Sequence, residues 1–357
     1  MPVPDWPVPA PDPVGGPLVL TPVDAYRTRP AEPDPVFELV QELVVPRLRA
    51  AVDRLPDPVR DMVGYHFGWV GENTGSPGRL VRPALTLLCA TAVGGPVERA
   101  VDAAVAVELV HNFALLHDDV MAGALTRRHR ETVWWRYGMP KAILVGDALL
   151  TLGFDLLSGA PDAVSIVCAA MQEMVHGQCL DISFEQRDEV SVDECLAVAG
   201  AKTAALLRCA CELGARTGGG RPARVRALKG FGWHLGVGFQ LADDLLGIWG
   251  DPRVTGRSPL ADLRAGKKTL PVVAALHTGG PGGAELAELY LRPEPLDDDE
   301  LVRVAALIER AGGRRWARSE AQRQHRTALA CLAAADPTRE ACHALAGLAA
   351  TLVPPDR

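Results

Sequence analysis

The stretch His117-Asp118-Asp119-Val120-Met121 closes a long apolar segment, 98–121, in which residues 101–116 are apolar on nearly every side. A helix without a polar face is buried all round, as at the centre of a large helical bundle. Two adjacent carboxylates at the end of such a helix are costly to bury unless they are paired or bind a metal ion. The stretch therefore predicts an all-α protein with a functional site at the end of a central helix.

The rest of the chain supports one large helical domain from residue 36 to residue 357. Apolar residues recur at three- and four-residue spacing, and Gly/Pro clusters separate the segments. The predicted helices span 36–53, 79–94, 98–121, 140–158, 162–185, 191–217, 222–249, 269–277, 299–312, 315–334 and 337–352. No strand, hairpin or internal repeat is expected. We predict a single bundle with its active site in a central cavity.

Residues 1–35 have a different composition and are predicted to be a disordered, proline-rich tail. They contain 11 of the 29 prolines, which prevents helices and central strands. Because proline-rich segments are pre-extended ligands, the same residues could dock a protein partner.

Overall composition points to a soluble cytoplasmic protein. The net charge of -7 makes nucleic acid an unlikely ligand, because nucleic-acid binding requires a basic face. The eight cysteines include no CxxC pair, which favours buried thiols in a reducing compartment. The N-terminus has no basic segment followed by an apolar run, so no secretory signal is expected. No uninterrupted apolar stretch of about 18 residues occurs, so no membrane span is expected either.

A second acid pair, Asp243-Asp244, ends the apolar segment 222–249. One such pair is best explained as a solvated helix end. Two pairs, each ending a long apolar helix, favour metal binding. Magnesium prefers hard carboxylate oxygens and usually keeps water and substrate phosphates as its other ligands. The two pairs therefore favour Mg²⁺ as the cofactor.

Basic residues surround these acids. Arg127 and Arg128 follow the first pair, Lys267 follows the second, and Arg79 and Arg82 open the helix predicted at 79–94. Lys202 interrupts an apolar helix, so its side chain either reaches the surface or points into a polar cavity. Acid pairs and bases together describe a site for a metal-bound polyanion such as diphosphate.

At this point the chain resembles the polyprenyl synthetase family, the trans-isoprenyl diphosphate synthases, over roughly residues 40–350. Seven motifs occur in the family's order, and together they are specific. They are Gly78-Arg79-Leu80-Val81-Arg82-Pro83, Glu108-Leu109-Val110-His111, His117-Asp118-Asp119 with Arg127-Arg128, Gly177-Gln178-Cys179-Leu180-Asp181, Lys202-Thr203, Phe239-Gln240-Leu241-Ala242-Asp243-Asp244, and Gly266-Lys267-Lys268-Thr269-Leu270-Pro271.

Two motifs depart from the family pattern. Ala122 stands where the third aspartate of the first aspartate-rich motif belongs, and Gly247 stands at the last aspartate of the second. Positions 118 and 122 share a helix face, so the first change removes a carboxylate from the metal-facing side. Either Asp251 or Asp262 could help to hold a metal near the second motif.

The resemblance implies a magnesium-dependent transferase that joins an allylic diphosphate to isopentenyl diphosphate, with Asp118, Asp119 and Asp243 as the magnesium ligands. It implies that Arg127, Lys202 and Lys267 bind the allylic diphosphate, and that Gln240 and Thr203 orient it. It also implies that Arg79, Arg82, His111 and Arg128 bind the diphosphate of isopentenyl diphosphate. Relatives are usually homodimers, so a homodimer is expected.

Product length in this family depends on residues before the first motif. Phe113 with the small Ala114 resembles geranylgeranyl diphosphate synthases, which predicts a C20 product, although Phe113 could equally be an ordinary core residue. Three other functions remain open. Loss of the aspartate at Ala122 could mark an impaired or regulatory homologue, and a terpene cyclase shares the fold but needs no second substrate. A structural protein docked through the tail is the third.

Overall fold

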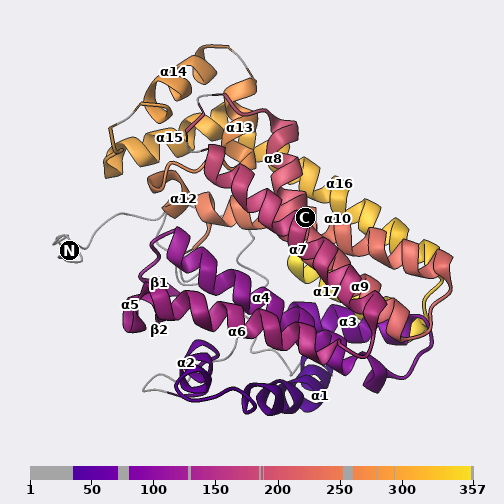
Figure 1. Ribbon diagram of the computed structural model, residues 1–357. Helices are drawn as coiled ribbons and strands as arrows, with labels where there is room; N and C mark the ends of the chain where they lie inside the picture. Colours follow the sequence, from indigo (N-terminus) through magenta and orange to yellow (C-terminus); the bar gives the residue numbers. More distant parts are fainter. Residues whose placement is uncertain are drawn as a thin grey trace.

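The computed structural model describes residues 35–70, 80–127, 130–184, 186–187, 189–251, 260–278, 280–292 and 294–354. Helices make up nearly all of these residues (Figure 1). The first half contains α1 (Pro35–Val52), α2 (Val59–His66), α3 (Val81–Ala92), the 3-10 helix η2 (Val97–Ala100), α4 (Val101–Met121), α5 (Val133–Tyr137), α6 (Met139–Leu156) and α7 (Pro161–Phe184). The prediction of an all-α fold is confirmed.

The second half continues in the same way. It contains α8 (Val192–Ala199), the π-helix η3 (Gly200–Ala204), α9 (Ala205–Thr217), α10 (Pro222–Trp249), α12 (Ala261–Arg264), α13 (Leu270–His277), α14 (Gly280–Tyr290), α15 (Asp298–Arg310), α16 (Gly313–Ala334) and α17 (Arg339–Leu352). Each of the eleven predicted helices corresponds to one or more of these elements.

Several details differ from the prediction. The short helices α2, α5 and α12 were not expected, because fewer than three turns carry little periodicity. Helix α14 begins at Gly280 within a cluster that we interpreted as a break; proline is tolerated in a first helical turn. The segment 191–217 is interrupted by η3. A two-stranded antiparallel pair also exists, β1 (Thr126–Arg127) with β2 (Arg130–Glu131), where no strand was expected.

Helix α4 is the central helix that its sequence predicts. Its residues from Ala103 to Val110 are all buried, and it packs against α3, α6 and α9. The segment Val97–Met121 is long and apolar enough to cross a membrane by length and composition, but 61% of its apolar window is buried inside the fold. Burial against neighbouring helices is the environment expected of a core helix.

Two hydrophobic clusters form the core of the described residues. The larger one joins α1, α3, α4, α6, α7, α9, α10, α16 and α17. A smaller one joins the end of α10 to α12–α15, which Figure 1 shows gathered at the end of the molecule opposite α1 and α2. Helix α10 contributes to both clusters, so it connects the two parts of the core.

Arg224 ties the ends of two other helices to α10. Its guanidinium donates to the carbonyls of Ala92 (2.7 Å) and Val93 (3.1 Å) after α3, and to those of Ala335 (2.7 Å) and Asp336 after α16. The last carbonyls of a helix have no partner within the helix, and a cation there also complements the helix dipole. A single side chain therefore satisfies the C-termini of both helices.

Candidate active site

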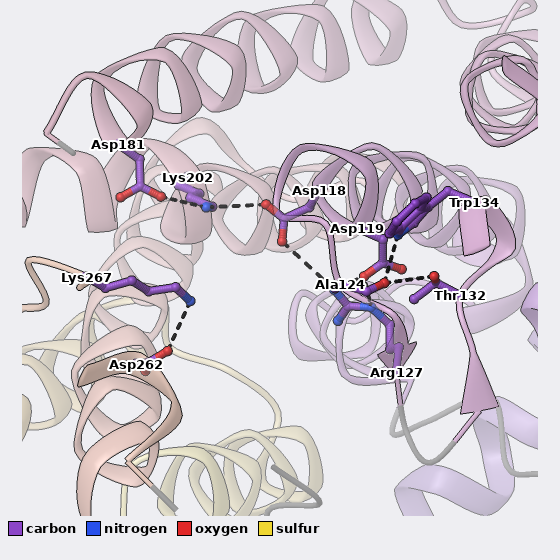
Figure 2. Close-up of polar contacts among 10 residues, drawn as sticks. All are labelled: Asp118, Asp119, Ala124, Arg127, Thr132, Trp134, Asp181, Lys202, Asp262 and Lys267. Atoms are coloured by element: carbon purple, nitrogen blue, oxygen red, sulfur yellow. Dashed lines mark hydrogen bonds and ion pairs between the residues drawn. The ribbon is translucent and has the colours of Figure 1, made fainter. Parts of the chain in front are cut away.

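The first acid pair lies at the C-terminal end of α4, and its two members have different environments. The side chain of Asp118 is 35% exposed, whereas that of Asp119 is 3% exposed. Arg127 on β1 donates to Oδ1 of Asp119 from Nε (2.9 Å) and from Nη2 (2.8 Å), but its Nη2 lies 3.9 Å from Asp118 (Figure 2). Asp119 thus holds Arg127, and Asp118 presents its carboxylate to the site.

The turn that brings Arg127 back to α4 is fixed by one carbonyl. The carbonyl of Ala124 accepts hydrogen bonds from Oγ1 of Thr132 and Nε1 of Trp134, both at 2.8 Å (Figure 2). The N–H of Ala124 donates to the carbonyl of Asp119 at 3.0 Å. These contacts explain why two short strands form here, because they return the chain directly after α4.

Lys202 lies between carboxylates from two helices. Its Nζ is 2.8 Å from Oδ2 of Asp181 on α7 and 3.5 Å from Oδ1 of Asp118 on α4 (Figure 2). Burial alone would lower the pKa of Lys202, but the attraction of the two carboxylates outweighs it and the pKa is raised. The Lys202 side chain therefore points into a polar site and stays charged.

Thr203, the next residue, connects the site to α10. Its Oγ1 donates to Oε1 of Gln240 at 2.6 Å, and Nε2 of Gln240 donates to Oδ1 of Asp244 at 2.7 Å. The other carboxylate oxygen of Asp244 accepts from the N–H of Leu270 at 3.1 Å, where α13 begins. Burial raises the pKa of Asp244 to about 7. Asp244 therefore links α10 to α13, while the neighbouring Asp243 is only half-buried.

The carboxylate of Asp262 lies beside Gly247, the residue that replaces the last aspartate of the second motif. A side chain at Gly247 would place its Cβ 1.8 Å from Oδ2 of Asp262, so the Asp262 carboxylate fills the space beside Gly247. Oδ1 of Asp262 accepts from Nζ of Lys267 at 3.0 Å (Figure 2). The hydroxyl of Tyr290 donates to the carbonyl of Lys267 at 2.8 Å. A carboxylate from α12 thus lies next to the position where the second motif lacks one. The other candidate, Asp251, follows the end of α10 and is half-buried.

The remaining predicted residues that the structure describes lie along α3 and α4. Arg82 is in the first turn of α3, which packs against α4. His111 and Ala114 precede Asp118 by seven and four residues, so all three share one helix face. Phe113 is turned toward α6: its ring packs at a tilt against that of His117 (centroids 4.5 Å apart), and Nε2 of His117 contacts the carbonyl of Ile143 at 3.1 Å. Arg79 and Arg128 lie outside the described residues.

Some residues near the site were not predicted. A cavity of about 120 Å³ beside the first motif is lined by Asp119 and Arg127 together with Tyr65 and His66 of α2. Nothing in the sequence pointed to α2, because it is short. Asp181 was also not predicted to be a site residue, although it ends a motif that we had recognised in the sequence.

The carboxylates of the site suit a magnesium ion whose remaining ligands are supplied by the substrate and by water. Among the described residues, no three His, Cys, Asp or Glu side chains lie together in a way that could hold a metal ion by themselves. Asp118 and Asp243 each offer hard carboxylate oxygens, and cationic side chains for an anion lie nearby. Magnesium commonly binds in this manner, through one or two carboxylates, water and substrate phosphates.

Comparison with known proteins identifies the family. The profile described as polyprenyl synthetase matches residues 69–308. The chain is 44% identical over 302 residues to a (2E,6E)-farnesyl diphosphate synthase of Mycobacterium tuberculosis, covering 81% of this chain and 84% of that one. It is 43% identical over 297 residues to a geranylgeranyl diphosphate synthase of the same organism, covering 80% and 85%.

Solved structures agree with the sequence comparison. The crystal structure of a polyprenyl synthetase from Streptomyces coelicolor A3(2) matches with a TM-score of 0.85 and 45% identity, covering 89% of this chain and 99% of that one. The family expected from the seven motifs is confirmed, as is the enzyme class of transferase. The chain belongs to the polyprenyl synthetase family of prenyltransferases.

Proposed function

We propose that this prenyltransferase condenses an allylic diphosphate with isopentenyl diphosphate in a magnesium-dependent reaction and releases geranylgeranyl diphosphate (C20). The observation that carries the proposal is the position of Lys202 between Asp118 and Asp181, with Thr203 bonded to Gln240 beside it. Cationic and hydrogen-bonding groups lie there among carboxylates from α4 and α7. This arrangement suits a metal-bound diphosphate.

Each group then has a distinct role. Lys202, Arg127 and Lys267 bind the allylic diphosphate as charged donors, and Gln240 and Thr203 orient it by hydrogen bonds. Asp118 and Asp243 hold magnesium, while Asp119 acts through Arg127. When bound, magnesium neutralises the diphosphate leaving group as the allylic C–O bond breaks. Arg79, Arg82, His111 and Arg128 bind the diphosphate of isopentenyl diphosphate, the second substrate.

For the formation of the C–C bond, the protein has only to position the two substrates and to exclude water. Holding the alkene of isopentenyl diphosphate against the allylic carbon removes the entropy of encounter. The allylic C–O bond breaks to leave a cation, the alkene attacks this cation to form the new C–C bond, and the resulting cation loses a proton to the departing diphosphate, so no side-chain base is assigned. The apolar face of α4 below Asp118 excludes water, which would otherwise capture the cation.

The C20 product is supported by Ala114, a small residue that lies one turn before Asp118 on α4. A C15 product is the second candidate, because the relative with 44% identity is a farnesyl diphosphate synthase. Purified protein should be incubated with isopentenyl diphosphate, magnesium and each of the C5, C10 and C15 allylic diphosphates, and the products sized by mass spectrometry. A C20 product from the C15 starter supports the proposal. Accumulation of C15 favours the second candidate, and no condensation favours an impaired or regulatory homologue.

We also propose a homodimer in the cytoplasm. Large apolar side chains are 40–62% exposed around the end of α4 and along α5 and α6, and they suit burial against a second copy. They are Met121, Leu125, Trp135, Met139, Ile143 and Leu144. Light scattering on the natural chain and on Leu144→Asp tests this assignment; a natural chain that is monomeric contradicts it. The proposed tail, 1–35, lies almost wholly outside the described residues, and its docking role stays a proposal.

A further inference from the structure

The backbone that carries Lys202 and Thr203 is wound more widely than an α-helix. Gly200–Ala204 forms a π-helix between α8 and α9, and the N–H of Ala205 donates to the carbonyl of Gly200, five residues earlier. Single π-turns inside α-helices are rare and are often found at functional sites. Lys202 and Thr203 are the third and fourth of its five residues.

The π-turn directs these consecutive side chains to different partners. Lys202 reaches the carboxylates of Asp181 on α7 and Asp118 on α4, whereas Thr203 reaches Gln240 on α10. The turn therefore connects three helices of the site through two adjacent residues. An α-helical turn over the same residues would rotate them relative to each other, and both sets of contacts would not be kept.

Helix α7 contacts one side of this turn at Gly177. A Cβ atom at Gly177 would lie 2.8 Å from the backbone nitrogen of Lys202 and 2.8 Å from Cβ of Ala201. Such distances are far below van der Waals contact, so a side chain at 177 requires the backbone of the turn, or α7, to move. Gly177 also precedes Asp181 by one helical turn, so its close approach places Asp181 within reach of Lys202.

Helix α10 contacts the other side at Gly236. A Cβ atom there would lie 2.4 Å from Cα and 2.6 Å from Cβ of Ala204. Gln240, the partner of Thr203, follows Gly236 by one helical turn. A third close contact involves Gly200, where a Cβ would lie 2.7 Å from the indole ring of Trp233. The π-turn is therefore enclosed on two sides by helices that approach it only because they present glycine.

We propose that Gly177 and Gly236 are positioning residues, which keep the π-turn wound so that Lys202 and Thr203 hold the allylic diphosphate together. The inference rests on the proposed function, because it assigns a role to the backbone beneath two of its substrate-binding residues. Neither glycine touches substrate. Each acts through the turn that it contacts.

The experiment compares Gly177→Ala and Gly236→Ala with two control variants in the full-length protein. In Gly214→Ala the new Cβ would lie 2.1 Å from the carbonyl oxygen of Thr86, in the contact between α9 and α3, so it reports a clash away from the turn. In Gly347→Ala nothing lies within 4 Å, so it reports the substitution without a clash. The thermal midpoint, kcat, and KM for each substrate are measured for all four.

We expect Gly177→Ala and Gly236→Ala to lower kcat by about 100-fold, the usual effect of misplacing one catalytic contact group. KM for the allylic diphosphate should rise, and KM for isopentenyl diphosphate should stay within about threefold. Gly214→Ala should lower the thermal midpoint but keep kcat within about threefold, and Gly347→Ala should keep both. Folded variants at 177 and 236 with natural kcat would overturn the proposal, as would an equal loss of kcat in folded Gly214→Ala.

A compensating change separates positioning from simple loss of stability. Adding Ala201→Gly to Gly177→Ala removes the 2.8 Å contact between the two Cβ atoms. We expect kcat to recover at least about threefold although the thermal midpoint falls further, because glycine destabilises a helix. If Gly236→Ala does not fold, position 177 still decides the question: recovery of kcat in the double variant supports the proposal, and natural kcat in folded Gly177→Ala overturns it.

Binding of inorganic pyrophosphate with magnesium, measured by calorimetry, distinguishes failure of the proposed function from failure of this inference. If the natural chain does not condense its substrates, the proposed function fails. The inference is then supported by a Kd for pyrophosphate that rises at least about tenfold in both glycine variants. It is overturned if that Kd is unchanged, or if the natural chain does not bind pyrophosphate.

Discussion

Arg127 donates two hydrogen bonds to a single oxygen of Asp119, and this buried pair lies one residue away from the more exposed Asp118. The two aspartates are adjacent in sequence but differ in what they touch. One organises a cation and the other faces the site. This division has consequences that can be measured.

Asp119→Asn should therefore mainly lower stability, whereas Asp118→Asn should mainly lower kcat. Loss of the charge at 119 weakens a buried, charge-assisted pair and should lower the free energy of unfolding by about 1–3 kcal/mol, with an increased KM for the allylic diphosphate. Asp118→Asn should change stability by only about 0.5 kcal/mol but lower kcat by about 100-fold. Urea denaturation and steady-state kinetics measure both. Equal effects of the two substitutions on stability and kcat would contradict the division.

Restoring the two missing aspartates should have opposite outcomes. Ala122 is exposed at the end of α4, so Ala122→Asp meets no steric obstacle. It should cost about 0.3–1 kcal/mol at the helix C-terminus and lower the magnesium concentration required for half-maximal rate. Gly247→Asp collides with Asp262 and should destabilise by about 1–3 kcal/mol and reduce kcat by displacing the partner of Lys267. A Gly247→Asp protein as stable as the natural chain would show that Asp262 does not occupy that space.

Product length should respond to position 114 more than to position 113. Ala114 lies on the face of α4 that carries Asp118, whereas the ring of Phe113 packs against that of His117 toward α6. Ala114→Phe should shorten the main product from C20 to C15 in the mass-spectrometric assay. Phe113→Leu serves as the matched control and should keep C20. If Ala114→Phe leaves the product unchanged and Phe113→Leu alters it, the floor of the product pocket lies on the face of α4 that carries Phe113.

Glu212 should stabilise the fold only above acidic pH. Burial of Glu212 would raise its pKa, but hydrogen bonds from Lys229 (2.8 Å) and Arg216 (3.0 Å) outweigh burial and the pKa is lowered. A lowered carboxyl pKa contributes stability above its ordinary value of 4.5, and the contribution is lost as pH falls through the folded pKa. Glu212→Gln should thus be destabilised by about 1–2 kcal/mol near pH 7 and by much less near pH 3, in urea denaturation. A difference that is independent of pH would contradict this origin.

Much of the fold followed from the sequence because long helices carry strong periodicity. The segment before Asp118-Asp119 was recognised as a central helix and the segment 222–249 as a long apolar helix, and the structure has them as α4 and α10. The short α2 could not be found in this way, although Tyr65 and His66 line the cavity beside the first motif. The strand pair was missed because each strand has only two residues.

Details of the site depended on packing that sequence patterns do not encode. Residues 191–217 form a continuous apolar pattern, so nothing indicated that one additional residue is accommodated as a π-turn at Lys202-Thr203. The close approach of Asp262 to Gly247 depends on how α12 folds back onto α10. The unequal exposure of Asp118 and Asp119 depends on Arg127 returning through β1.

Release of pyrophosphate as a function of isopentenyl diphosphate, at a fixed concentration of C15 allylic diphosphate and with magnesium, tests the central claim most directly. A condensing enzyme is predicted to release pyrophosphate at a rate that saturates with isopentenyl diphosphate, is abolished by chelator, and falls about 100-fold in Lys202→Ala. Release from the allylic diphosphate alone, unaffected by isopentenyl diphosphate, would indicate cyclisation or hydrolysis. No release under any condition would contradict the assignment of this site as catalytic.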